Sequence, residues 1–243
     1  MDIKDFLSEL DKTSETTISV IHVPSINKNI EFELFNVRQQ KLLLKTAFEG
    51  VEGVINSNIF YNNFIHDNCK EPVEFSIIDR PSIIVNLRKS SLNDTVTIKD
   101  TVYDLNELGD IDYSKFNLDH TVISDNITCN LHIPTLVNDT SICKRLVVEL
   151  TSQSDEQKKT ESVSLLLTYE IMKYIKSMQI ADTVLEFNNL SIYERKTVIE
   201  KLPLKLNNLI LDFIVDVKAK CTEYLTFEDG AVLEIDASFL SSE

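Results

Sequence analysis

The first clear pattern along the chain is an alternation of apolar and polar residues over positions 17–35. Residues 30–34 read Ile-Glu-Phe-Glu-Leu, which is the period-two pattern of a strand with one buried face. A similar alternation begins at Thr17, and the two stretches are separated by a segment of turn-forming residues that starts at Pro24. These features predict a β-hairpin over residues 17–35.

Helical signals follow this hairpin. Asn36 and Gln39 have the spacing of a capping box, so a helix should begin there and end near Gly50. The spacing of apolar residues predicts a second helix over 53–66. A third helix should open at Asp79, with a proline in its first turn, where a missing N–H group costs little.

The middle of the chain carries strand patterns instead. Short alternations predict one hairpin over residues 95–98 and 101–105 and another over residues 118–124 and 127–133. In the last of these strands Cys129 falls on the apolar face, so its side chain should pack inward.

The signal from residue 138 to residue 180 is helical, because apolar residues recur every three or four positions. The wholly polar segment 151–160 interrupts it and is the best candidate for a linker. A strand is expected over 183–187, followed by a helix that is capped by Ser191 and Glu194 and ends near 201. An amphipathic helix should begin at Pro203, and a hairpin should follow over 222–235 around Glu228-Asp229-Gly230.

Together these elements predict an α+β fold. It has an N-terminal β-hairpin followed by helices, a central antiparallel β part, and a helical C-terminal part that ends in a β-hairpin. We expect an N-terminal arm (1–16), a hairpin with helices (17–92), a central β part (93–136), and a helical part with a terminal hairpin (137–243). The last segment alternatively forms one continuous domain with residues 17–92.

The N-terminal arm is polar and acidic, with a weak helical pattern of apolar residues at Ile3, Phe6, Leu7 and Leu10. Such an arm is either a frayed helix or a segment that docks on a partner.

Composition and charge narrow the classes of function. Only 4 of the 243 residues are glycine, whereas an average usage of about 7% would give roughly 17, so glycine-rich phosphate loops have little to be built from. Asp and Glu number 39 against 24 Lys and Arg, a net charge of −15. This charge repels phosphates and anionic lipids, and we expect neither a nucleic-acid nor a membrane partner. With no signal-peptide pattern and no span-length apolar stretch, a cytoplasmic protein with reduced thiols is expected.

The cysteines and histidines show no ligand spacing. Cys69, Cys129, Cys143 and Cys221 are far apart, with no C-x-x-C pair. His66 and Cys69 come closest to a ligand pair, but a histidine at the end of a helix is more simply a partner of the helix dipole. One alternative stays open, a metal-dependent enzyme with ligands gathered in space from His66, Cys69, His120 and His132.

The acidic run that begins at Asp104 resembles a calcium loop only superficially. Gly109 occupies the sixth position, but the EF-hand pattern also needs a ligand at the fifth and a glutamate at the twelfth. Here Leu108 and Lys115 stand at those positions. We therefore expect a solvated acidic loop.

Catalytic motifs are equally missing from the sequence. No serine lies in a G-x-S-x-G motif, and no pair of carboxylates can be assigned to acid–base work from spacing alone. The sequence therefore predicts a protein that is not an enzyme, with no catalytic, cofactor-binding or metal-ligating residues. Such a protein is expected to act by binding other proteins.

Two segments resemble a known family. The first runs from His22 through Pro24, Asn36 and Val37 to Leu44, and the second opens at Asp79 and continues as Ile-Ile-Val-Asn-Leu-Arg-Lys-Ser over residues 83–90. They resemble the hairpin-to-helix opening and the following helix of the baseplate hub proteins of T-even-like contractile-tailed phages, a family that includes the hub subunit and the hub assembly protein. The order of elements in the C-terminal part fits the same family.

This resemblance implies a non-enzymatic phage tail protein that forms, or helps to assemble, the central hub of the baseplate. Its partners would be other hub and tail proteins, in homo- or hetero-oligomers, and it would be found in the virion baseplate, in the host cytoplasm during assembly, or in both. Some family members carry paired cysteines where only Cys129 and Cys221 stand here, so no zinc site is expected. Arg88 is expected to tie its helix to an acidic neighbour, by a surface or intradomain salt bridge in preference to a contact with a partner. The alternative is an acidic adaptor or chaperone unrelated to phage tails.

Overall fold

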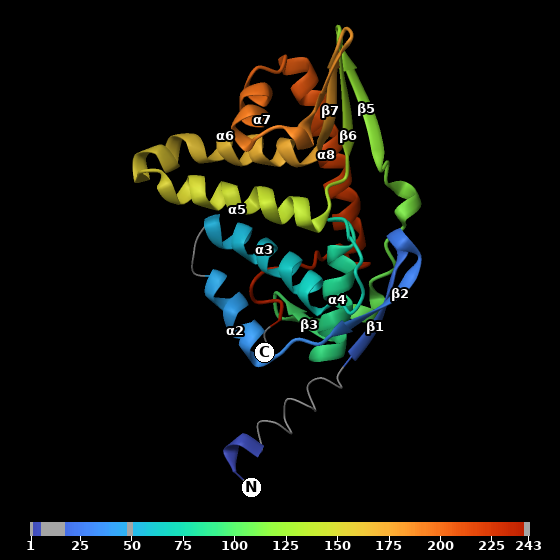
Figure 1. Ribbon diagram of the computed structural model, residues 1–243. Coiled ribbons are helices and arrows are strands. Elements are labelled where there is room, and N and C mark those ends of the chain that lie inside the picture. Colours follow the sequence, from blue (N-terminus) through green and yellow to red (C-terminus); the bar gives the residue numbers. More distant parts are fainter. Residues whose placement is uncertain (1, 6–17, 48–50, 241–243) are drawn as a thin grey trace.

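The computed structural model describes residues 2–5, 18–47 and 51–240, and the arm predicted over 1–16 lies largely outside them. The helices are α2 (Val37–Thr46), α3 (Val51–Asn68), α4 (Arg80–Ser91), α5 (Leu136–Ser152), α6 (Asp155–Tyr174), α7 (Ile192–Glu200) and α8 (Leu204–Tyr224). The strands are β1 (Ile18–Val23), β2 (Lys28–Glu33), β3 (Thr95–Ile98), β4 (Thr101–Asp104), β5 (Asp119–Ser124), β6 (Ile127–His132), β7 (Ile175–Ile180) and β8 (Thr183–Glu186). The predicted α+β class is confirmed (Figure 1).

The N-terminal part follows the sequence pattern closely. Strands β1 and β2 pair antiparallel with Ile21 opposite Ile30, and the apolar face of the hairpin is buried against α4. The capping box of α2 is complete, since Asn36 Oδ1 accepts from the Gln39 N–H group and Gln39 Oε1 accepts from the Asn36 N–H group, both at 3.0 Å. The predicted hairpin and the start of the first helix are therefore confirmed.

The central sheet is larger than the sequence predicted. Its order is β5-β6-β7-β8, antiparallel throughout. The prediction that the helical signal continues to residue 180 is wrong, because α6 ends at Tyr174 and the chain continues directly into β7. Pairing of β7 with β6, which places Met178 opposite Cys129, supplies ladder hydrogen bonds and burial that outweigh the helical spacing of the apolar residues.

The linker predicted over 151–160 is also wrong. Helix α5 continues to Ser152 and α6 begins at Asp155, so only a tight turn separates them. Figure 1 shows the two helices side by side, with their connection projecting from the body of the molecule. A helix end surrounded by water needs no apolar face, which explains why a polar sequence is helical here.

The last hairpin expected from the sequence is reduced to a turn. Helix α8 runs on to Tyr224, and only one isolated bridge, between Thr226 and Val232, joins the two sides. Gly230 adopts a φ of 86°, a left-handed conformation that favours glycine. The hairpin that does lie in the C-terminal part is β7–β8.

Two hydrophobic clusters form the interior of the described residues. One lies between the β5–β8 sheet and helices α5 to α8. The other combines the β1–β2 hairpin and helices α2 to α4 with side chains of residues 227–240. Residues 227–240 therefore return to complete the core built by the β1–β2 hairpin and helices α2 to α4, and Figure 1 shows this segment beside α2.

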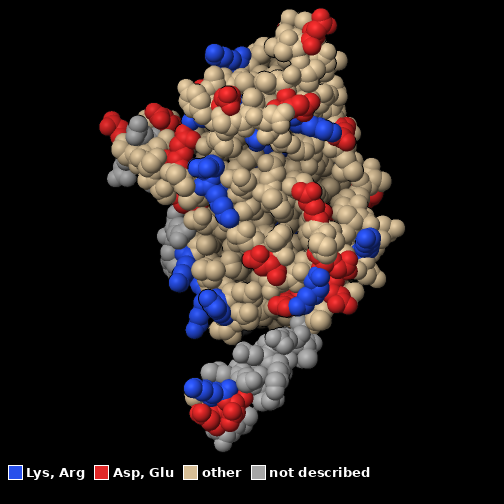
Figure 2. Space-filling model, viewed as in Figure 1, with Lys and Arg blue, Asp and Glu red and all other residues tan. Residues whose placement is uncertain are grey.

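Charged side chains are spread over the surface seen in Figure 2, where lysines and arginines gather over α2. Among the described residues, no helix combines the length and the apolar character needed to cross a bilayer.

Candidate functional site

A buried carboxylate lies in the interior at Asp139, which is only 4% exposed. It lies in the first turn of α5, a helix whose N-cap Thr135 accepts a 3.2 Å hydrogen bond from the Asn138 N–H group. A carboxylate is favoured near a helix N-terminus by the peptide dipoles. Burial nevertheless requires direct partners for its charge.

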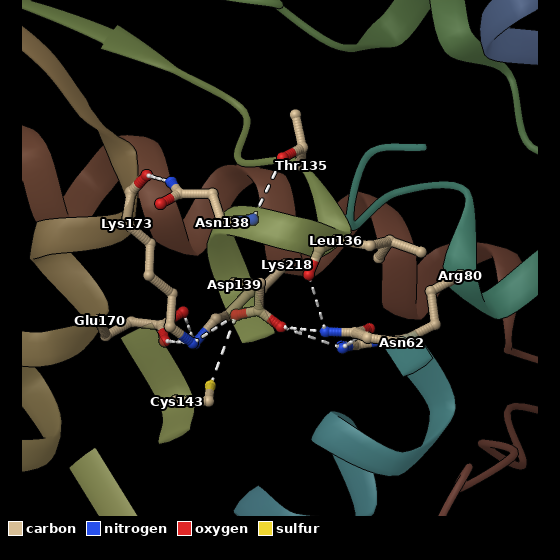
Figure 3. A network of polar contacts seen from close by, with 10 residues as sticks. All are labelled: Asn62, Arg80, Thr135, Leu136, Asn138, Asp139, Cys143, Glu170, Lys173 and Lys218. Carbon is tan, nitrogen blue, oxygen red and sulfur yellow. Dashed lines mark hydrogen bonds and ion pairs between the residues drawn. The ribbon is translucent and has the colours of Figure 1, made fainter. Parts of the chain in front are cut away.

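Three other elements supply those partners (Figure 3). Lys173 of α6 places its Nζ 2.7 Å from Asp139 Oδ1. On the other carboxylate oxygen, Asn62 of α3 donates through Nδ2 at 2.8 Å, and Arg80 of α4 lies 3.4 Å away through Nη1. Asn62 Oδ1 in turn accepts from Arg80 at 3.1 Å, so the two partners also hold each other.

The network extends to a fifth helix. Glu170 binds Lys173 at 2.8 Å, and Lys218 of α8 approaches the second carboxylate oxygen of Glu170 at 2.8 Å. Helices α3, α4, α5, α6 and α8 are thus joined by one set of ion pairs and hydrogen bonds, which we call the Asp139 network: Asn62, Arg80, Asp139, Glu170, Lys173 and Lys218. The helices that carry these residues contribute to both hydrophobic clusters.

Asp139 and Lys173 both stay charged at neutral pH. Burial raises the pKa of Asp139, but Lys173 and Arg80 outweigh burial and hold the pKa at about 2. Burial lowers the pKa of Lys173, yet Asp139 and Glu170 raise it above its usual value overall. Groups that stay charged across the neutral range cannot exchange protons with a substrate there, so this arrangement suits positioning of helices.

A cavity of about 390 Å³ borders the network. Its wall contains Arg80, Lys173, Lys218 and Cys221. Burial raises the pKa of the Cys221 thiol to about 11, and burial raises that of nearby Cys143 to about 11 as well. Both thiols stay protonated at neutral pH, and a thiol is a far weaker nucleophile than a thiolate.

A second buried carboxylate, Asp79, fixes the entry to α4. The helix starts where predicted, but the Asp79 side chain does not cap it. Instead Asp79 Oδ2 accepts from the N–H and hydroxyl groups of Ser76, at 2.7 and 2.9 Å, and Oδ1 accepts from the Tyr113 hydroxyl. Asp79 therefore holds the turn before α4 against the loop that precedes β5.

Arg88 lies inside the molecule, only 3% exposed. Its guanidinium donates to the carbonyl oxygens of Phe239 at 2.7 Å and Thr95 at 2.9 Å, and it stacks over the Phe239 ring at 5.2 Å. These partners are carbonyl groups and not the carboxylate that we expected, and they tie α4 to the C-terminal segment and to β3.

The four residues of the open metal alternative do not form a set of three or more ligands. His66 is exposed at the end of α3 beside Asp67, and Cys69 follows the helix. His120 stacks on Phe213 at 5.2 Å, whereas His132 is opposite Asp119 in the β5–β6 register. Among the described residues, no three His, Cys, Asp or Glu side chains are placed to hold a metal ion.

The acidic loop has a structural explanation in its short helical turns. Asp104 and Asp112 each accept a hydrogen bond from the N–H group two residues later, at 2.8 and 3.0 Å.

Cys129 is fully buried, as predicted, and burial raises the pKa of its thiol to about 12.

Sequence reasoning missed the Asp139 network, although a signal for it exists. Asp139 stands between Leu136 and Cys143, three and four positions away on the apolar stripe of α5. A charged residue at a stripe position needs a buried partner of opposite charge. Which residue provides that charge depends on how the helices pack, and the sequence pattern does not give this.

Comparison with known proteins gives no relative. No protein-family model, no curated protein and no solved structure matches the chain.

Proposed function

We propose that this chain is a non-enzymatic bacteriophage tail protein that forms, or helps to assemble, the central hub of the baseplate through protein–protein contacts. The proposal starts from the two segments, 22–44 and 79–90, that resemble the baseplate hub family. One observation supports it most. These segments pack together, because the buried residues of both belong to the same hydrophobic cluster.

Four residues carry the resemblance beside the hydrophobic pattern, and each has a structural role there. Pro24 opens the short helical turn between β1 and β2, Asn36 caps α2, Asp79 holds the turn before α4, and Arg88 binds the C-terminal segment. Residues that specify one substructure are expected to recur together in a family. The structural roles of these residues support a shared fold of the N-terminal part.

The chemistry of the interior favours a scaffold as well. The buried carboxylate of Asp139 is paired and stays ionised, and the buried thiols stay protonated. These groups hold elements in place and offer no activated nucleophile or neutral-pH acid–base pair. A rigid molecule of this kind is suited to present surfaces to partners.

The deciding experiment is quantitative mass spectrometry of purified virions and of infected-cell lysate, combined with affinity capture of the tagged chain from that lysate. Capture of baseplate proteins would support the proposal. A fixed copy number in virions would then identify a permanent hub component, and presence in lysate alone would identify an assembly factor. Capture without any tail protein would contradict the proposal and favour the acidic adaptor.

A further inference from the structure

Helix α2 has an inner face whose polar groups all reach partners. Leu43 is fully buried. Gln40 Nε2 donates to the Leu240 carbonyl at 2.6 Å, Gln39 Nε2 donates to Asn68 Oδ1 at 3.3 Å, and the Thr46 hydroxyl donates to the Leu43 carbonyl at 2.7 Å. This face is used to fix α2 to α3 and to the C-terminal segment.

The outer face of α2 is different. At about 100° per residue, one arc of about 140° contains only Val37, Arg38, Lys41, Leu42 and Lys45. All five are exposed, and the apolar residues among them, Val37 and Leu42, are 65% and 55% exposed. We call these five residues the outer α2 face.

The charge of this face is opposite to that of the molecule. Helix α2 contains three cations and no acidic residue, in a chain of net charge −15. Within the described ranges, the ion pairs found involve none of Arg38, Lys41 and Lys45, and Figure 2 shows the basic cluster over α2. The outer α2 face is therefore complementary to an acidic helix with apolar side chains of its own.

A nucleic acid or a lipid surface is a poorer match. The outer face offers only two apolar residues, Val37 and Leu42, beside three cations, whereas membrane-surface helices bury a broad apolar face. The remaining negative charge of the chain would oppose approach to either polyanion.

The N-terminal segment of the chain itself has the complementary chemistry. Residues 2–11 carry apolar residues at positions 3, 6, 7 and 10, the spacing of one helical face, together with Asp2, Asp5, Glu9 and Asp11. Asp5 and Glu9 are four positions apart, as are Lys41 and Lys45. In the structure the Ile3 side chain is 70% exposed, so the rest of the same chain does not cover it.

We propose that the outer α2 face binds the N-terminal segment, residues 2–11, of a second copy of this chain. The donating segment and the accepting helix are different surfaces, so the contact is head-to-tail and produces a ring or an open chain of copies. This self-association goes beyond the proposed function and is tested on the purified chain alone.

The test is sedimentation velocity of the full chain at about 100 µM, a concentration that populates complexes of micromolar Kd. The wild type should form oligomers. Lys41→Glu/Lys45→Glu and Asp5→Lys/Glu9→Lys should each weaken association about tenfold or more, because attraction becomes repulsion. The matched control is Lys201→Glu/Lys205→Glu, which reverses two exposed lysines of the same spacing elsewhere and should associate like the wild type.

Combining both reversals should restore association, since the charge pairing is re-formed with opposite signs. This rescue also excludes misfolding as the cause of the single-site losses. A monomeric wild type, a combined variant that stays monomeric, or unchanged association after removal of residues 1–16 would overturn the proposal. The proposal would also be overturned if a peptide of residues 1–16 bound only to the shortened chain and the full chain formed no oligomers, because the segment would then dock on α2 of its own chain. Binding of a monomer to anionic vesicles would overturn the proposal as well.

Discussion

At the scale of single residues, the buried charge of Asp139 makes the fold sensitive to the loss of one side chain. Asp139 is almost inaccessible and is shared by Lys173 and Arg80. An ion pair in the interior adds little net stability when it is intact, because both charges lose their hydration. Loss of one partner is costly, since the other charge then remains buried without compensation.

We therefore expect Asp139→Ala to lower the free energy of unfolding by about 3–5 kcal/mol. The measurement is urea unfolding at neutral pH. The control is Asp216→Ala, which removes half of an exposed ion pair with Lys220 and should cost less than about 1 kcal/mol. Equal losses for the two variants would contradict a special role for the buried carboxylate.

The same carboxylate should shape the stability of the protein in acid. Its pKa falls from 3.8 to about 2 on folding, so its contribution is fully present above about pH 4 and is lost as the pH falls toward 2. Over that interval the wild type should lose about 2 kcal/mol more than Asp139→Ala does. Parallel acid limbs in unfolding experiments on the two proteins would argue against this.

Cysteine reactivity offers another test at this scale. Cys129 and Cys143 are buried, and burial raises their thiol pKa values to about 12 and about 11. Cys69 is only half-buried. A thiol reagent should label Cys69 first in the native protein and reach the two buried thiols only on unfolding. Loss of the fast phase in Cys69→Ser would identify it, and fast labelling of Cys129 would refute the prediction.

At the scale of elements, capping explains why helices begin where the sequence predicts. The boxes of Asn36 with Gln39 and of Ser191 with Glu194 are both complete, because they depend only on residues three positions apart. The end of α6 had no such local signal. The residues of β7 become a strand because β6 and β8 lie on either side of them.

For α2 we expect Asn36→Ala to cost about 1 kcal/mol of unfolding free energy, because the Gln39 N–H group loses its acceptor. Asn36→Asp keeps an acceptor at the same place and should stay near the wild type. Thermal or urea unfolding of both variants measures the difference. An alanine variant as stable as the aspartate variant would show that the cap is dispensable.

At the scale of the whole molecule, residues 227–240 close the N-terminal core. Arg88 and Gln40 donate to the backbone carbonyls of Phe239 and Leu240, and the Tyr61 hydroxyl donates to the Asp236 carbonyl at 2.7 Å. Helices α2 to α4 and residues 227–240 are therefore parts of one packed unit. The Asp139 network then joins this unit to the helices of the other cluster.

Phe239→Ala should consequently destabilise the protein by about 3–5 kcal/mol, because it empties a buried aromatic site and removes the ring under Arg88. Val232→Ala, at a position 41% exposed, is the control and should cost much less. Urea unfolding followed by circular dichroism measures both. A Phe239→Ala variant as stable as the control would mean that the C-terminal segment is not part of the core.

The sequence by itself determined the features that depend on near neighbours: the alternation of the β1–β2 and β5–β6 hairpins, both capping boxes, the start of α4 and the inward position of Cys129. Period-two and three-to-four spacing report burial of one face, and this does not require knowledge of the partner.

Only the tertiary structure decided the rest. It placed Lys173 beside Asp139, paired β7 with β6, continued α5 and α6 through a polar segment, and returned residues 227–240 to the first core. The ion pair, the strand pairing and the return of residues 227–240 each depend on burying a group against a partner that is far away in the sequence. The polar ends of α5 and α6 need no such partner, because they project into water. A pattern of apolar and polar positions shows that a partner is needed, but packing determines which residue it is.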